Sequence, residues 1–139
     1  MVNSQYILDI LDLAFDDHSQ SDLLRKQVPF LNITYIDHTG IGVFVHFSAD
    51  DQIQQFKLDT SNATNFDIEG NPTSMVNGVE IKNSDLFILA DAIIHLKNGI
   101  IDYLEIWNKC GEDYVLRDPD HYQLDQVWLD KPKSRTIIR

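Results

Sequence analysis

The chain has 139 residues, 43% hydrophobic and 24% charged, which is the composition of one ordinary globular domain over 1–139 and excludes a disordered or collagen-like chain. Its 22 acidic residues outnumber the 11 basic ones and give a formal net charge of −11. So acidic a surface repels phosphate backbones, which argues against direct binding to nucleic acids.

The first part of the chain, residues 4–27, is predicted to be helical. Over 4–16, apolar residues recur at helical spacing, acidic residues take the other side, and Ser4 is a suitable N-cap. A shorter helix is expected over 19–27, because Pro29 ends the segment. We expect the first helix to cover one face of a sheet.

Residues 30–129 are predicted to form that sheet. Apolar and polar residues alternate over 30–35 and 41–47, on either side of the turn residues at 37–40, which predicts a β-hairpin. Residues 53–58 are expected to add a short strand. The polar stretch that follows, 59–77, is expected to be a long loop.

A second hairpin gives the strongest local signal. The strand-like segments 86–97 and 100–107 flank Asn98 and Gly99, the dipeptide best suited to a two-residue type I′ turn. A further strand is expected over 122–129. The predicted fold class is therefore α+β, with an N-terminal helix or two packed on an antiparallel, curved sheet of about five to seven strands.

The turn also predicts a register for this hairpin. An unbroken ladder places His95 opposite Asp102, an ion pair that orients the imidazole. The same ladder puts Tyr103, Glu105 and Trp107 on the face that carries the alanines of the first strand. A carboxylate in this aromatic setting suits acid–base chemistry or the binding of a cationic group. A structural, hydrogen-bonded glutamate is the alternative.

The last segment, 131–139, forms a basic tail. It contains four of the 11 basic residues and none of the 22 acidic ones. We expect this tail to fold back on the acidic body of the protein.

Motifs for catalysis, cofactors or metals are missing from the sequence. It contains no P-loop, nucleophile elbow or dinucleotide-binding glycine pattern, and its histidines lack metal-ligand spacing. The single cysteine, Cys110, cannot form an internal disulfide. We therefore expect no enzymatic activity, no cofactor and no metal site.

Without a signal peptide or an apolar stretch long enough to span a membrane, a cytoplasmic location with no membrane partner is expected.

Acidic residues gather in predicted turns and helix ends. Solubility is one explanation, and a surface that steers a basic protein, imitating the polyanion it binds, is the other. The two tryptophans are candidate anchors for such an interface. The candidate contact residues are Asp50, Asp51, Glu112, Asp113, Asp118, Asp120, Trp107 and Trp128.

Three stretches resemble small bacterial immunity proteins of polymorphic or contact-dependent growth inhibition toxin systems. Residues 77–81 (Asn-Gly-Val-Glu-Ile) and 90–106, an apolar strand, an Asn-Gly turn and a strand that ends in Leu-Glu-Ile, are similar to their final hairpin. Residues 40–45 are similar to an earlier hairpin. Proteins of this class bind and neutralise a cognate toxin, often a basic nuclease, inside the producing cell. The resemblance implies that role, and no set of binding residues transfers with it.

Two main hypotheses follow. In the first, the chain is a non-enzymatic immunity protein whose acidic surface binds and neutralises a basic, nuclease-type toxin. In the second, it is a small ligand-binding module or enzyme with a pocket around Tyr103, Glu105 and Trp107. A scaffold subunit that self-associates through a sheet edge is a third alternative, and the sequence leaves the oligomeric state open.

Overall fold

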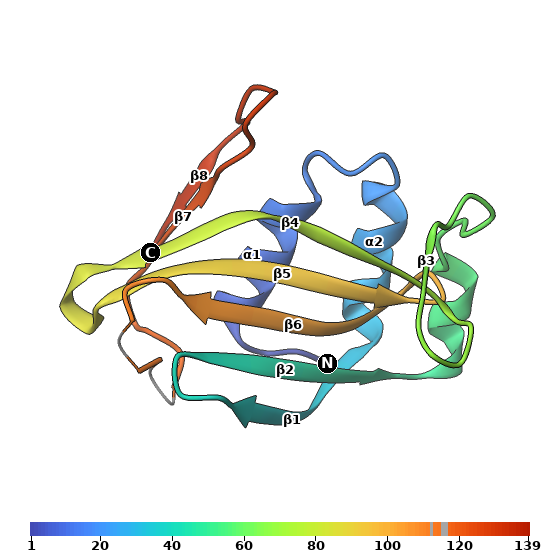
Figure 1. Ribbon diagram of the computed structural model, residues 1–139, viewed down its shortest axis with the longest axis horizontal. Coiled ribbons are helices and arrows are strands. Elements are labelled where there is room, and N and C mark those ends of the chain that lie inside the picture. Colours follow the sequence, from blue (N-terminus) through green and yellow to red (C-terminus); the bar gives the residue numbers. More distant parts are fainter. Residues whose placement is uncertain (112, 115–116) are drawn as a thin grey trace.

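The computed structural model describes residues 1–111, 113–114 and 117–139. Two α-helices, α1 (Gln5–Phe15) and α2 (Ser21–Gln27), lie against one face of an open antiparallel sheet (Figure 1). This two-layer arrangement confirms the predicted α+β class. The described strands are β1 (Leu31–His38), β2 (Gly42–Ala49), β3 (Asn65–Phe66), β4 (Pro72–Asn83), β5 (Ile88–Lys97), β6 (Ile100–Asn108), β7 (Gln123–Gln126) and β8 (Thr136–Ile138).

The sheet has eight strands in the order β1-β2-β6-β5-β4-β7-β8, with β3 paired beside β4. All of the pairings are antiparallel. The first hairpin, β1–β2, therefore lies beside the second, β5–β6, while β7 and β8 extend the sheet past β4 (Figure 1). Short 3-10 helices occur at Val28–Phe30 (η1), Asp51–Phe56 (η2) and Ser84–Leu86 (η3).

The first helix forms as the sequence predicts. The Ser4 side chain accepts a hydrogen bond from the backbone N–H of Ile7 at 3.1 Å and so caps α1. The apolar side of the helix supplies Ile10, Leu13 and Phe15 to the core, all fully buried. Burial of these side chains fixes α1 on the sheet.

A buried glutamine joins α2 to the second hairpin. Gln27, at the end of α2, is fully buried. Its Nε2 donates to the backbone oxygens of Phe56 and Gly99, each at 2.9 Å. Its Oε1 accepts from the N–H of Ile101, also at 2.9 Å. One side chain thus satisfies three backbone groups around the β5–β6 turn.

The turn between β5 and β6 also has the predicted form. Asn98 and Gly99 adopt left-handed conformations, with φ of 53° and 75°, as a type I′ turn requires. At Gly99 a side chain is further excluded by packing, because a Cβ would lie 2.7 Å from the backbone oxygen of Leu58.

Beyond this turn, the predicted register is wrong. The ladder is regular for two pairs, and then His95 pairs with Tyr103 because Asp102 is an extra, bulged residue. The expected pairing of His95 with Asp102 does not form. Glu105 lies opposite Ile93 rather than opposite an alanine. Because a shift of one residue turns every later side chain over, the odd-numbered residues of β6 after the bulge face away from the helices.

Two further segments differ from the prediction. Residues 53–58 form no strand, and η2 takes their place, with the Asp50 side chain accepting from the N–H of Gln52 at 3.0 Å. The expected loop at 59–77 contains β3 and the first part of β4. A register shift between Val76 and Val79 interrupts the alternation of β4, which explains why the sequence pattern did not reveal this strand.

Candidate functional site

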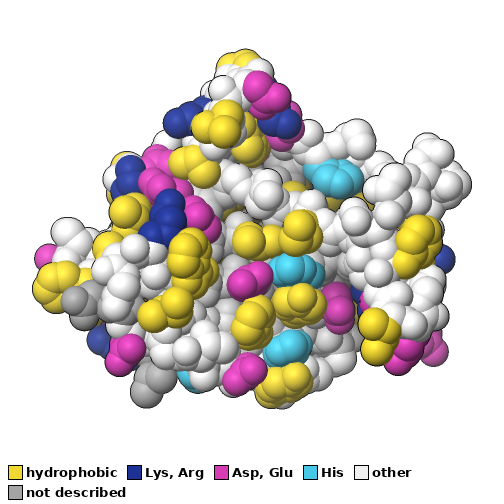
Figure 2. All heavy atoms as spheres, in the orientation of Figure 1, with side chains coloured by type: hydrophobic (Ala, Val, Ile, Leu, Met, Phe, Trp, Pro, Cys, Tyr) yellow, Lys and Arg dark blue, Asp and Glu magenta, His cyan; other side chains and the backbone are white. Residues whose placement is uncertain are grey.

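The sheet has a face that α1 and α2 do not cover, and we call it the outer face. It is formed by β1, β2, β6, β5 and β4, which are adjacent in the sheet. On β2, Val43 and Val45 are buried on the helix side, whereas Phe44 and His46 point outward and are partly exposed. Figure 2 shows hydrophobic, histidine and acidic side chains gathered near the centre of this face.

Four rings form a row across four strands of the outer face. Tyr35 of β1 stacks on His46 of β2, with ring centroids 4.2 Å apart, and Tyr103 of β6 stacks on His95 of β5 at 4.1 Å. His46 and Tyr103 join the two pairs at 5.5 Å. Tyr35 remains 58% exposed, so the row is open to solvent at one end.

Two β-bulges build this row. The pairing of β1 with β2 shifts between Ile33 and Tyr35, which turns Tyr35 onto the outer face. The bulge at Asp102 does the same for Tyr103. Bulges redirect side chains in this way at functional edges and faces of sheets.

Glu105 lies in the next row of the same face. Its neighbours across the strands are Phe44 on β2 and Ile93 on β5. The Nε2 of His95 lies 2.9 Å from its Oε1. The Glu105 side chain is 30% exposed and that of His95 is 19% exposed, so both are reachable from solvent.

The outer face carries two hollows beside these rows. One, of about 570 Å³, is lined by Ile93 of β5 and bounded by Trp128, which packs against Gly78. The other, of about 560 Å³, is lined by His95 and Tyr103. Because Ile93 and His95 are alternate residues of β5, both hollows open on the same face.

The residues of the predicted pocket are neighbours on this open surface. Tyr103, Glu105 and Trp107 follow one another on the outward side of β6, and Trp107 is 47% exposed. Neither of the two hollows is lined by Glu105 or Trp107. The predicted aromatic setting of the carboxylate is therefore present on an exposed face rather than inside an enclosed cavity.

Charge is distributed unevenly over the outer face. On its β4–β5 side, Lys109 lies 2.8 Å from Glu80 and 2.9 Å from Asp91. On its β1–β6 side, none of the lysines or arginines in the described residues forms an ion pair with Asp37 or Glu105. Asp37 and Glu105 thus place negative charge beside the aromatic row that no lysine or arginine of the described residues neutralises.

The predicted acidic contact residues do not form one surface. Asp50 and Asp51 follow the last residue of β2. Asp113, Asp118 and Asp120 follow β6, and the antiparallel pairing of β2 with β6 puts the ends of these two strands at opposite ends of the sheet. Glu112 lies outside the described residues.

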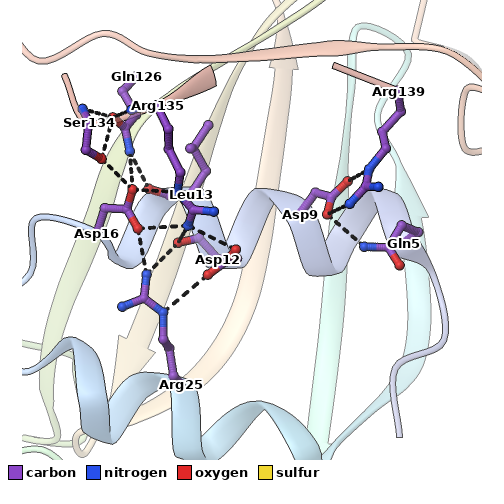
Figure 3. Close-up of polar contacts among 10 residues, drawn as sticks. All are labelled: Gln5, Asp9, Asp12, Leu13, Asp16, Arg25, Gln126, Ser134, Arg135 and Arg139. Carbon is purple, nitrogen blue, oxygen red and sulfur yellow. Dashed lines mark hydrogen bonds and ion pairs between the residues drawn. The ribbon is translucent and has the colours of Figure 1, made fainter. Parts of the chain in front are cut away.

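A second charged cluster holds the basic tail on α1 (Figure 3). Arg139 pairs with Asp9, whose side chain is 5% exposed. Asp16 accepts from Arg25 at 2.7 Å and from Arg135 at 2.8 Å. The tail therefore folds back on the acidic body, as its charge predicts, and the acidic side of α1 is largely neutralised.

These contacts change the pKa values of the two carboxyl groups. Hydrogen bonds from Arg135 hold the pKa of Asp16 well below its ordinary value, although burial opposes them. For Asp9, burial acts to raise the pKa, but hydrogen bonds from Arg139 and Tyr122 outweigh it and lower the pKa.

Acid is expected to weaken the stabilisation that the contacts between the tail and α1 provide. A carboxyl group whose folded pKa lies below its unfolded value stabilises the fold above the unfolded pKa and loses that contribution as the pH falls through the folded pKa. Asp9 and Asp16 start from an unfolded value of 3.8, so the loss is expected from just above that pH downward. The urea midpoint should stay level down to about pH 5 and fall between about pH 5 and pH 2. In Asp16→Asn the fall should be shallower, and a wild-type midpoint that stays constant would contradict this account.

The described residues offer little for a metal site or a membrane-spanning helix. Within 1–111, 113–114 and 117–139, no three His, Cys, Asp or Glu side chains are arranged to hold a metal ion. Cys110 is exposed and its thiol is free. None of the helices in the described part of the chain has both the length and the apolar character needed to cross a membrane.

Comparisons of this chain with models of protein families, with curated proteins and with solved structures found no match. The function is therefore inferred from the residues of the outer face. Its features are exposed aromatic rings, two hollows and carboxylates without a lysine or arginine partner in the described residues.

Proposed function

We propose that the protein is a cytoplasmic, non-enzymatic immunity protein that binds and neutralises a basic, nuclease-type toxin through its outer face. The observation that carries this proposal is the aromatic row of Tyr35, His46, Tyr103 and His95, exposed on a sheet face with Glu105 beside it. In this account the protein acts by occluding the toxin and needs no cofactor.

The composition of the outer face supports binding to a protein. Tyrosine and tryptophan are the residues that most often contribute large binding energies at interfaces, and here Tyr35 and Trp107 are 58% and 47% exposed. The five strands of this face are 8 to 12 residues long. With a spacing of about 4.8 Å between strands and a rise of about 3.3 Å per residue, the face is about 20 Å wide and at least about 26 Å long. In a standard interface each partner buries about 800 Å², and the outer face supplies a large part of that area.

The charge supports a basic partner. The formal net charge is −11, and the acids of α1 are neutralised by the tail while Asp37 and Glu105 on the outer face are not paired with lysine or arginine in the described residues. Such complementarity gives fast association that slows at high salt. It also agrees with the resemblance to immunity proteins, many of whose toxins are basic nucleases.

The ligand-binding alternative has less support. A pocket around Glu105 requires an enclosed, partly apolar cavity that holds the carboxylate. Glu105 instead lies on the open face, and the two hollows beside it are lined by other residues.

The proposal is tested by co-expressing the chain with the toxin domain encoded immediately upstream of its own gene. Growth should be rescued, and the two purified proteins should form a complex whose association rate falls as salt is raised. A chain that is folded, as judged by circular dichroism, but neither rescues growth nor binds the toxin would contradict the proposal. Circular dichroism of the expressed chain separates this outcome from simple misfolding.

A further inference from the structure

We infer that Glu105 and the rings around it form a binding site for one guanidinium group, supplied by an arginine of the partner protein. This inference rests on the proposed function, since it assigns the chemistry of one contact in the same interface. It is carried by the hydrogen bonding of the carboxylate, by the rings on either side of it and by the engagement of the nearest lysines elsewhere.

The carboxylate is held in place and has a free oxygen. His95 Nε2 lies 2.9 Å from Oε1 of Glu105 and fixes the orientation of the side chain. Among the described residues, no hydrogen bond to Oε2 of Glu105 is formed. Because the side chain is 30% exposed, a donor from another molecule can reach that oxygen.

Aromatic rings flank the carboxylate in two directions. Phe44 lies directly across from Glu105 on β2, and its ring meets that of Tyr103 edge-on, with centroids 5.9 Å apart. Trp107 lies two residues further along β6 and is 47% exposed. A cation bound to Glu105 would therefore lie near aromatic rings, whose faces attract cations through their quadrupoles.

This combination suits a guanidinium better than an ammonium. The guanidinium group is planar and weakly hydrated, so it can stack on a ring while it donates hydrogen bonds to a carboxylate. An ammonium is compact and strongly hydrated, and it loses more hydration among rings. Ile93 on β5, across from Glu105, makes the surroundings still less favourable for an ammonium.

The lysines of the same face are held elsewhere. Lys109 pairs with Glu80 and Asp91. Lys97 lies 3.8 Å from Asp67. None of the lysines or arginines in the described residues pairs with Glu105, so a guanidinium for this site is expected from another molecule. Asp37 on β1, directly across from Phe44, adds to the negative potential that attracts it.

The test is an NMR titration of the labelled protein with N-acetyl-arginine-N-methylamide. The probe should shift the resonances of Tyr103, Glu105 and Trp107 together and with one saturable curve. The citrulline analogue, which has the same shape without the charge, should cause no such shifts, and the lysine analogue should bind more weakly. Glu105→Gln should weaken arginine binding about fivefold or more, because it removes the charged acceptor.

Asp22→Asn is the matched control, because it removes one acidic charge from the exposed side of α2, on the other side of the sheet, and should leave the binding constant unchanged. Phe44→Leu should weaken binding while keeping the carboxylate, which separates ring contacts from charge. Equal binding of the citrulline analogue, or equal effects of Glu105→Gln and Asp22→Asn, would overturn the inference. The probe contains no toxin, so this test is independent of the growth rescue. A chain that rescues growth but does not bind the arginine probe refutes the guanidinium site alone. A chain that binds the probe but does not rescue growth refutes the toxin as its partner.

Discussion

Replacing Gln27 by leucine should lower the free energy of unfolding by about 3 kcal/mol. The three hydrogen bonds of Gln27 satisfy the backbone oxygens of Phe56 and Gly99 and the N–H of Ile101. Leucine has a similar volume, so the substitution leaves little cavity, but it leaves the oxygen of Phe56 and the N–H of Ile101 without the partner that Gln27 provides. The oxygen of Gly99 keeps its hydrogen bond from the N–H of Leu58. The loss should therefore come from polar groups rather than from packing.

Urea unfolding followed by circular dichroism measures this loss. Gln54→Leu is a suitable control because Gln54 is exposed on η2, and surface changes of this kind cost less than about 0.5 kcal/mol. A cost below about 1 kcal/mol for Gln27→Leu would show that water or an alternative side chain replaces the three hydrogen bonds.

Reversing the charge of Glu105 should have the largest effect on the proposed function. Glu105→Lys is expected to weaken binding to the basic toxin by about 100-fold or more, since like charges facing each other across an interface cost several kcal/mol. The substitution places a cation between Phe44 and Trp107, where we infer that the partner's guanidinium lies. Stability should change by less than about 1 kcal/mol because the side chain is partly exposed.

The matched control is Asp22→Lys, which makes the same change of charge on the exposed side of α2. If local contacts on the outer face dominate, this control should weaken binding by less than about fivefold, mainly through the association rate. Isothermal titration calorimetry at two salt concentrations compares the two variants. Equal losses would indicate that only the overall charge matters, and that result would contradict a specific role for Glu105.

Local signals in the sequence were sufficient where a few adjacent residues determine the structure. Ser4 and the apolar spacing after it predicted α1, and Asn98 with Gly99 predicted the turn of the second hairpin. The excess of basic residues after residue 130 predicted the tail, because it faces an acidic helix whose carboxylates attract it.

The bulges were not predictable from these patterns. One extra residue, Asp102, reverses the faces of the rest of β6, and nothing in the alternation marks it as bulged. The predicted partner of His95 was therefore Asp102, whereas Glu105 takes that role. The sequence signal was compatible with either face being buried, since both sides of the hairpin contain apolar residues.

The candidate site was accordingly only half predicted. Tyr103, Glu105 and Trp107 were placed together because alternate residues of one strand share a face in any register. Their neighbours Phe44 and His46 come from β2, more than 50 residues earlier, and only the pairing of β2 with β6 brings them there. The acidic turns, in contrast, were grouped by charge alone, and the fold separates them.

The central claim is that the outer face, and not the helical face, binds the toxin. Methyl-labelled protein bound to the toxin domain encoded beside its gene tests this claim directly. The account predicts large shifts for the methyl groups of Ile93 and Met75, which line the outer hollows, and small shifts for Leu8 and Leu23 on the helices. Large shifts confined to the helical methyl groups would contradict it.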